Sequence, residues 1–284
     1  MPVWFRQKLP RAGEISSSDE LLHGLGLHTI CESGHCPNTS QCFPGGAAFL
    51  ILGNICLRNC TFCAVTKGIS LPPDPDEPGH IVEAARRLKL KYIFITSVTR
   101  DDLPDGGAAH YAANINLLHK ELPGIKVEVL VPDFKGNPAA INTVVQSKPH
   151  VFGHNLETVP RLYPEVRPMA DYRRSLDVLK QVKTFVPGMI TKSGIMLGFG
   201  ETREEVISVM QDLREVGCDL FTLGQYLAPS LQNYPVVNFP TPKEFASYEP
   251  IGLEMGFKGV ASAPLMRSSF KAEEFFSQAI GGNA

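Results

Sequence analysis

The sequence lacks three features that would direct it to a particular partner or compartment. It has no excess of one charge sign, because 27 Lys and Arg nearly balance 29 Asp and Glu, so charge gives no reason to expect nucleic acid or an anionic membrane as a partner. Its longest apolar run, residues 47–52, is far shorter than the roughly 20 residues that span a bilayer. The first ten residues contain no apolar stretch of the signal-peptide kind, and we therefore expect a cytoplasmic protein.

Cysteine is scarce outside one short segment. The chain has seven cysteines, and six of them fall between Cys31 and Cys63. In a secreted protein such a cluster would predict disulfides. Without an export signal, a reducing compartment is the better assumption, and clustered cysteines there are usually metal ligands.

The middle of the chain alternates short apolar runs with amphipathic stretches, which predicts βαβ units and a parallel sheet. We expect an α/β fold, a partial (β/α)6 barrel of the TIM type, over residues 46–240. Residues 1–45 form a cysteine-bearing N-terminal extension, and residues 241–284 form a C-terminal tail with two helices. The predicted strands are residues 47–53, 92–96, 126–131, 150–154, 192–198 and 220–225. The predicted helices are residues 81–89, 111–122, 172–186 and 202–216.

One cysteine motif begins directly after the first predicted strand, where a barrel places catalytic loops. Cys56, Cys60 and Cys63 (the Cys56 triad) have the spacing C-x3-C-x2-C, and the aromatic Phe62 precedes the last of them. Three thiolates on one tight loop can hold three corners of a cubane iron–sulfur cluster. The fourth iron is then open and can bind the amino and carboxylate groups of S-adenosylmethionine (SAM). The pattern predicts a radical SAM cluster.

Zinc or buried structural cysteines are the alternatives for this triad. A structural zinc site normally has four ligands, and no fourth Cys or His stands at the usual spacing. A non-enzymatic zinc or redox-sensing module therefore remains a less favoured hypothesis, which iron and zinc analysis would separate from ours.

A second motif lies just upstream and makes the resemblance to one family close. Cys31, Cys36 and Cys42 (the Cys31 triad) have the spacing C-x4-C-x5-C. Two such triads in tandem resemble lipoyl synthases, as do several further segments that together cover nearly the whole chain. They are residues 4–10, 49–53, 100–108, 154–163, 191–194, 198–201 and 267–270.

The resemblance implies that the Cys31 triad holds an auxiliary [4Fe-4S] cluster, the second of two per chain. In that family its fourth ligand is a serine of a C-terminal Arg-Ser-Ser-aromatic motif. Here Ser268 and Ser269 are the candidates, and we expect Ser269. On residue pattern alone, a helix N-cap before residues 270–278 is the favoured role of these serines, and the resemblance, with the preceding Arg267, reverses that preference. Cys218 is expected to be a buried structural cysteine.

The resemblance also implies which residues bind SAM and the substrate, although each could be an ordinary turn residue. The expected SAM contacts follow predicted strands: Thr96, Ser97, Asn155, Glu157 and Gly198. The expected catalytic or substrate residues are Arg100, Asp101, Arg167, Tyr172 and Ser175.

The resemblance implies insertion of two sulfur atoms at C6 and then C8 of an octanoyl group on a lysine of a carrier domain. The carrier would be a glycine cleavage H-protein or the acyltransferase subunit of a 2-oxoacid dehydrogenase. A flavodoxin or ferredoxin would supply electrons. Another two-cluster radical SAM sulfur-inserting enzyme, such as a methylthiotransferase, is the alternative; there the upstream cysteines usually lie far from the radical SAM triad and a nucleic-acid-binding tail is expected.

Overall fold

A computed structural model describes residues 1–5, 16–39 and 48–281. The chain divides into two compact units. The N-terminal unit comprises residues 8–58 and 64–152, and the C-terminal unit comprises residues 1–7, 59–63 and 153–284. Each unit is described by itself.

The N-terminal unit is built on parallel strands covered by helices. Its strands are β1 (His28–Thr29), β2 (Ala48–Ile51), β3 (Ile55–Cys56), β4 (Thr66–Lys67), β5 (Tyr92–Ser97), β6 (Lys126–Leu130) and, at its end, β7 (Val151–Gly153). Its helices are α1 (Ser16–Gly24), α2 (Ile30–Ser33), α4 (Glu77–Arg87), α5 (Ala108–Glu121), η2 (Phe134–Gly136) and α6 (Pro138–Gln146).

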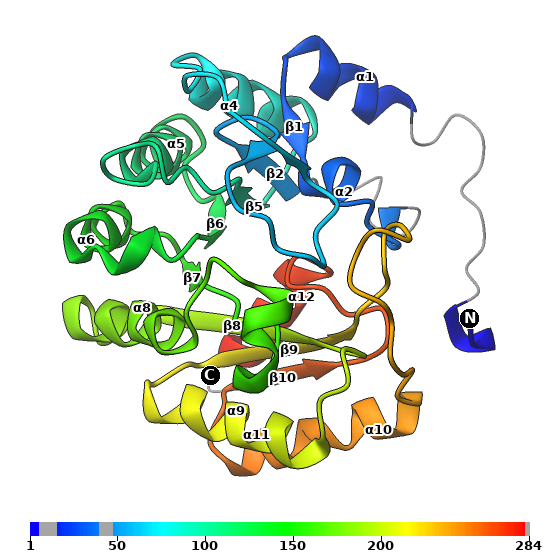
Figure 1. Ribbon diagram of the computed structural model, residues 1–284. Helices are drawn as coiled ribbons and strands as arrows, with labels where there is room; N and C mark the ends of the chain where they lie inside the picture. The colour runs from blue at the N-terminus through cyan, green and yellow to red at the C-terminus, as the bar shows by residue number, and fades with distance from the viewer. Residues whose placement is uncertain (6–15, 40–47, 282–284) are drawn as a thin grey trace. The chain divides into compact units, whose positions relative to one another are not determined.

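The strand order in this unit is β1-β2-β5-β6-β7. β2, β5 and β6 pair in parallel, whereas the short β1 pairs with β2 in the antiparallel sense. Helix α5 contacts both α4 and α6, and the three helices follow one another alongside the strands (Figure 1). Residues on both faces of the strands are buried, including Phe49, Ile95 and Val127 at 0% exposure, as expected for parallel strands inside an α/β fold.

The C-terminal unit repeats this strand–helix pattern. Its strands β8 (Ile190–Leu197), β9 (Leu220–Gln225) and β10 (Gly259–Ser262) are parallel neighbours in that order. Its helices are η1 (Val3–Phe5), η3 (Pro160–Leu162), α7 (Tyr163–Val166), α8 (Tyr172–Phe185), α9 (Arg203–Glu215), α10 (Pro242–Ala246), α11 (Tyr248–Glu254) and α12 (Ala272–Gly281). Helix α9 begins with the capping box of Thr202 and Glu205 that the sequence indicates.

The predicted fold class is confirmed: both units show the alternation of parallel strands and helices expected of a partial (β/α)6 barrel. All six predicted strands and all four predicted helices are present, with ends shifted by a few residues. The prediction missed α1 and α6, and in the tail, expected to hold two helices, it missed β10 and one of the three helices α10, α11 and α12.

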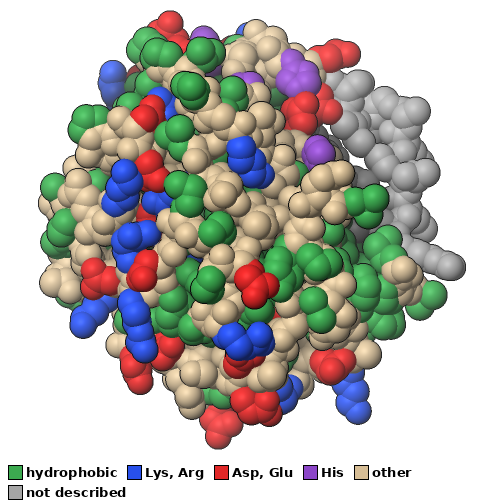
Figure 2. Space-filling model, viewed as in Figure 1, with side chains coloured by type: hydrophobic (Ala, Val, Ile, Leu, Met, Phe, Trp, Pro, Cys, Tyr) green, Lys and Arg blue, Asp and Glu red, His purple; other side chains and the backbone are tan. Residues whose placement is uncertain are grey.

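Charge on the surface is mixed. On the face drawn in Figure 2, Lys and Arg side chains are interspersed with Asp and Glu side chains, in line with the balanced composition. Within the described residues, no helix combines the length and apolar character that a membrane crossing requires.

Candidate functional site

Cys56 lies at the end of β3 and is held by the segment that follows β5. The backbone N–H of Thr99 donates to Cys56 Sγ at 3.4 Å, and the N–H of Leu57 donates to the Thr99 carbonyl at 3.4 Å. The first cysteine of the Cys56 triad therefore stands, half-buried, beside the carboxyl end of a parallel strand, where the sequence places it.

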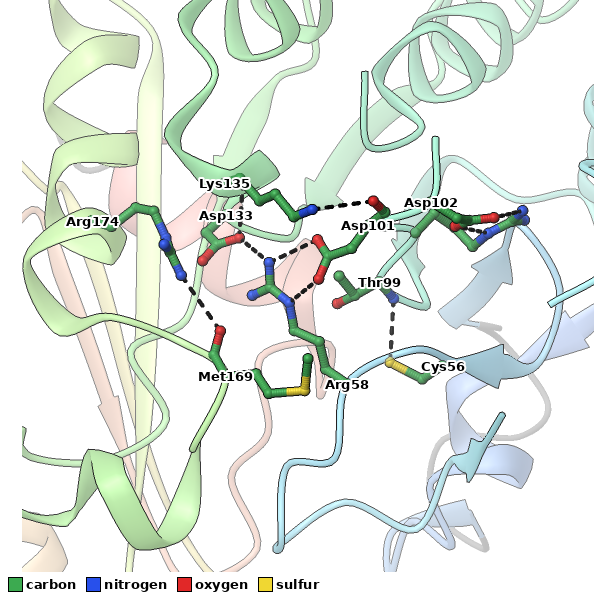
Figure 3. Close-up of polar contacts among 10 residues, drawn as sticks. Cys56, Arg58, Thr99, Asp101, Asp102, Asp133, Lys135, Met169 and Arg174 are labelled. Atoms are coloured by element: carbon green, nitrogen blue, oxygen red, sulfur yellow. Dashed lines mark hydrogen bonds and ion pairs between the residues drawn. The ribbon is translucent and has the colours of Figure 1, made fainter. Parts of the chain in front are cut away.

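Arg58, two residues after Cys56, is fixed by two carboxylates (Figure 3). Its Nε and Nη2 donate to Asp101 at 2.8 and 2.9 Å, and Nη2 also donates to Asp133 at 2.6 Å. Burial by itself would lower the pKa of Arg58, but the two carboxylates raise it above its ordinary value. Asp101 therefore uses its carboxylate to hold Arg58.

Arg100 is directed into the protein. Only 2% exposed, it donates from Nε and Nη2 to Asp102 at 2.9 and 2.7 Å. Its Nη1 reaches the carbonyl of Leu52, at 3.4 Å. Leu52 has a positive φ of 67° at the start of the segment that leads to Cys56. Arg100 thus supports a strained backbone turn.

Cys60 and Cys63 belong to the C-terminal unit, where other segments hold their loop. Thr61 between them donates from its N–H to the Val166 carbonyl at 3.0 Å and from its hydroxyl to the Glu165 carbonyl at 2.9 Å. The Asn233 amide donates to the carbonyls of Thr61 and Cys63, at 3.0 and 3.2 Å. The loop has its own scaffold within this unit.

The aromatic residue of the motif contacts the glycine-flanked loop after β8. The Phe62 ring lies edge-to-face with Phe199, with centroids 6.4 Å apart. Neighbouring Gly198 has a φ of +113°, and a Cβ there would lie 2.1 Å from the Gln225 amide nitrogen. Only glycine fits this position. Glu201 accepts the N–H groups of Gly198 and Phe199, at 2.7 and 2.9 Å, which fixes the loop.

A single turn of the backbone brings Cys31 and Cys36 close together. Cys31 lies in α2, and the Cys36 N–H donates to the Cys31 carbonyl at 2.9 Å. Burial, with the nearby Cys36, raises the pKa of Cys31 to about 11. Such a thiol is protonated unless a metal displaces the proton. Cys42 lies outside the described residues.

Arg167 donates hydrogen bonds to several residues that follow β7. Its Nη1 donates to the carbonyls of Asn155 and Leu156 and to the Tyr163 hydroxyl, each at 3.0 Å. Burial raises the pKa of the Glu157 carboxyl, and the charge of Arg167 opposes that shift. Glu157 also has a positive φ of 65°, a backbone conformation that is uncommon outside glycine. The structure thus brings Asn155, Glu157 and Arg167 together.

The C-terminal Arg-Ser-Ser segment lies on two glycines of adjacent strands. Gly194 of β8 would place a Cβ 3.2 Å from Ser268 Oγ, and Gly224 of β9 would place one 1.9 Å from the Met266 carbonyl. The Asn155 amide donates to Ser268 Oγ at 2.9 Å. Lys192, 2% exposed, donates to the Ser268 carbonyl at 2.7 Å. Ser268 is therefore held inward, and half-buried Ser269 follows it.

The remaining predicted residues lie in two places. Thr96 and Ser97 end β5, and the Thr96 hydroxyl donates to the Leu130 carbonyl at 3.0 Å. Tyr172 begins α8, and its hydroxyl donates to Asp212 of α9 at 2.7 Å; burial, reinforced by Asp212, raises its pKa. Ser175 is fully buried. Tyr172 and Ser175 thus face the interior of the C-terminal unit.

Sequence reasoning missed Arg58, Asp133 and Lys192 as parts of the site. Arg58 lies within the Cys56 triad and Lys192 within the segment 191–194. Only the structure shows that both charged side chains are buried. In the part of the chain that the structure describes, no three His, Cys, Asp or Glu side chains converge as they would around a single ion. Ligands of a cubane cluster bind separate irons and need not converge in that way.

Comparisons with known proteins agree with this arrangement. The family model described as the radical SAM superfamily matches residues 50–213. A relative from Caldanaerobacter subterraneus subsp. tengcongensis named lipoyl synthase is 54% identical over 281 residues, which cover 99% of this chain and 98% of the relative. A relative of the same name from Nitratidesulfovibrio vulgaris (strain Hildenborough) is 50% identical over 98% of this chain and 93% of the relative.

Solved structures resemble the fold at low sequence identity. HydG, a maturase of the [FeFe]-hydrogenase, superimposes with a TM-score of 0.61 at 15% identity, over 81% of this chain and 54% of HydG. Methylornithine synthase gives a TM-score of 0.53 at 14% identity, over 78% of this chain and 67% of that enzyme. At this identity the likeness shows the fold alone.

Proposed function

Because this chain belongs to the lipoyl synthase family of the radical SAM superfamily, we propose how its residues divide the work of sulfur insertion. The enzyme uses two [4Fe-4S] clusters and SAM. The observation with most weight is identity of about half over nearly the whole chain, with both triads in place. Lipoyl synthases of this identity and coverage favour neither alternative function, the methylthiotransferase or the zinc module.

We assign the radical SAM cluster to the Cys56 triad and the auxiliary cluster to the Cys31 triad with Ser269. The donor sets fit: each triad offers three soft thiolates, and Ser269 offers one harder oxygen. When bound, these groups supply the electron and the deoxyadenosyl radical, and the sulfide that joins the octanoyl chain at C6 and then C8. The protein holds the reacting groups in place and excludes water that would quench a radical.

The residues after β7 support a SAM-binding role. Asn155 and Glu157 offer an amide and a carboxylate suited to a ribose diol or an ammonium, and Arg167 fixes the backbone that presents them. Thr96 and Ser97 at the end of β5 and Gly198 after β8 occupy comparable strand ends. We propose these five residues as the SAM contacts, with Arg167 facing the reacting region.

We propose that four of the expected substrate residues act indirectly, by positioning other residues of the site. Arg100 and Asp101 support the segments on either side of Cys56. The Tyr172 ring packs edge-to-face on Tyr163, with centroids 5.4 Å apart, and Tyr163 accepts a hydrogen bond from Arg167. Tyr172 and Ser175 would thus shape the region around Arg167.

The substrate is a lipoyl-carrier protein. We propose the octanoylated glycine cleavage H-protein or the acyltransferase subunit of a 2-oxoacid dehydrogenase, with flavodoxin or ferredoxin as electron donor, in the cytoplasm. The division of the chain into an auxiliary-cluster extension (1–45), a barrel (46–240) and a serine-bearing tail (241–284) belongs to the same proposal.

Substitution of the two triads separates the two half-reactions. Cys56→Ala should abolish formation of 5′-deoxyadenosine, because no electron reaches SAM. Cys31→Ala should retain SAM cleavage in part and lose lipoyl product, because this triad supplies sulfur. Anaerobic assays of both products, with Cys218→Ala as the control for a buried cysteine outside both triads, test this. Normal 5′-deoxyadenosine formation by Cys56→Ala would refute the assignment.

A further inference from the structure

The loop of the Cys56 triad contains one buried charge, and that charge has two opposite partners. Arg58 is 5% exposed, Asp133 is 1% exposed, and Asp101 is largely shielded. Figure 3 shows the Arg58 guanidinium between the two carboxylates, in bidentate contact with Asp101. Arg58, Asp101 and Asp133 are called the Arg58 clamp below. Bidentate pairs fix orientation as well as distance.

The two acids come from the loops that follow neighbouring parallel strands. Asp101 follows β5 and Asp133 follows β6, and these strands pair along their length. Asp133 also accepts the Lys135 N–H at 3.1 Å, and Lys135 Nζ donates to the Asp101 carbonyl at 3.2 Å. The acids are therefore themselves fixed, so that the position of Arg58 is set by the sheet.

A second set of contacts holds the start of the same segment. The N–H of Leu52 donates to the buried Glu77 at 3.0 Å, and its carbonyl accepts from Arg100. The Cys56 carbonyl accepts the Gly68 N–H at 3.1 Å. The segment from the end of β2 to Arg58 is thus held by hydrogen bonds at Leu52, Cys56 and Arg58, all of them to other groups of the protein.

We propose that the Arg58 clamp is a positioning device that fixes the segment from Leu52 to Arg58, and with it Cys56, before any cluster is bound. Asp101 then acts by holding Arg58, and it does not touch substrate. The inference rests on the proposed function only in taking the Cys56 triad as the site of the radical SAM cluster. A segment that already holds Cys56 in place lowers the conformational cost of binding a cluster through that thiolate.

Arg58→Lys is the informative variant, because it keeps the charge but loses the planar fork. In chelator-stripped protein, hydrogen exchange at Leu57 and Thr99 should quicken at least about tenfold, as expected when local opening becomes easier. After reconstitution, iron should fall by about four atoms per chain, one cubane. The change that SAM causes in the EPR spectrum of the reduced protein should be lost.

Asp101→Asn should produce the same pattern more weakly, because one partner of Arg58 remains. Arg87→Lys is the matched control. Arg87 Nε donates to Glu83 at 2.7 Å, but Arg87 is 58% exposed and lies on α4, outside the loop. We expect that control to leave exchange, iron content and the EPR response unchanged. Urea unfolding of every variant separates local loosening of the loop from a general loss of stability.

Two outcomes overturn the clamp. One is unchanged exchange and unchanged EPR response in Arg58→Lys. The other is an Asp101→Asn protein that keeps both of those properties and loses only lipoyl product, which would make Asp101 a substrate contact. Failure of the proposed function is distinguishable, since it would appear as a SAM-dependent EPR response that survives in Cys56→Ala.

Discussion

Ser268 and Ser269 are adjacent in sequence but have different surroundings. The Ser268 hydroxyl is bonded to Asn155, and its carbonyl is bonded to Lys192. Asn155 is also a proposed SAM contact, so one side chain links that region to the tail. We propose Ser269, rather than Ser268, as the ligand of the auxiliary cluster. An alkoxide is a harder ligand than a thiolate and should leave the iron more readily.

Ser269→Ala should retain SAM cleavage and lose lipoyl formation, whereas Ser269→Cys should bind iron as well as wild type and also be impaired. Ser268→Ala should keep most of the lipoyl formation, because it removes one hydrogen bond worth about 1 kcal/mol. Product analysis with iron content for the three variants decides this. Wild-type product from Ser269→Ala with none from Ser268→Ala would assign the ligand to Ser268, and full activity of both would exclude a serine ligand.

The proposed roles of Cys56, Cys60 and Cys63 can be predicted from the sequence because the three candidate ligands share one short motif. The role of Arg58 cannot, since its partners lie 43 and 75 residues away. Lys192 is similar: its tail partner is 76 residues distant. Such pairs depend on which strands become neighbours, and no local pattern encodes that.

At the scale of elements, prediction succeeded where burial on both faces leaves an apolar run, as in β5 and β9. It missed β10, whose Gly-Val-Ala-Ser sequence has little intrinsic strand preference and which exists by pairing with β9. It missed α6 although a signal was present. Asn137 caps the helix by accepting the N–H of Ala139 at 3.0 Å, and Pro138 occupies the first turn.

The contact between α5 and His150, the residue before β7, makes the free energy of unfolding depend on pH. His150 Nδ1 accepts the Val127 N–H at 3.1 Å, which requires an unprotonated nitrogen, and the ring lies edge-to-face with His119. Burial, together with Lys126 and His119, lowers the pKa of His150 to about 4 from 6.5. Between these values the unfolded chain binds more protons, so the free energy of unfolding should fall as pH drops from 6.5 towards 4.

Anaerobic urea unfolding at pH 7 and pH 5 measures this effect. His150→Asn should unfold more easily at pH 7 but lose less stability on acidification than wild type. His80→Asn, which changes a histidine of α4 outside this pair, serves as the control. A His150→Asn protein with the same pH dependence as wild type would assign the acid sensitivity to other groups.

At the scale of the whole molecule, the proposed cluster ligands are distributed over both units of the chain. Cys31, Cys36 and Cys56 belong to the N-terminal unit, and Cys60, Cys63 and Ser269 belong to the C-terminal unit. The fold class followed from strand–helix alternation, and the reaction followed from the motifs together with relatives of nearly full length. How the tail contributes follows only from the structure, because Gly194 and Gly224 look like ordinary strand glycines in the sequence.

If the auxiliary cluster is the source of the inserted sulfur, as proposed, the enzyme should consume part of itself during turnover. A cubane holds four sulfides and one lipoyl group takes two, so a chain that loses its cluster on use should make no more than about one lipoyl group without repair. Protein carrying ³⁴S in both clusters, supplied with unlabelled SAM and an octanoylated carrier peptide, should yield lipoyl product with two heavy sulfurs by mass spectrometry. The matched Cys31→Ala protein should yield none. Unlabelled product from fully labelled clusters would exclude the donor role, and several product groups per chain without added sulfide or repair proteins would exclude self-consumption.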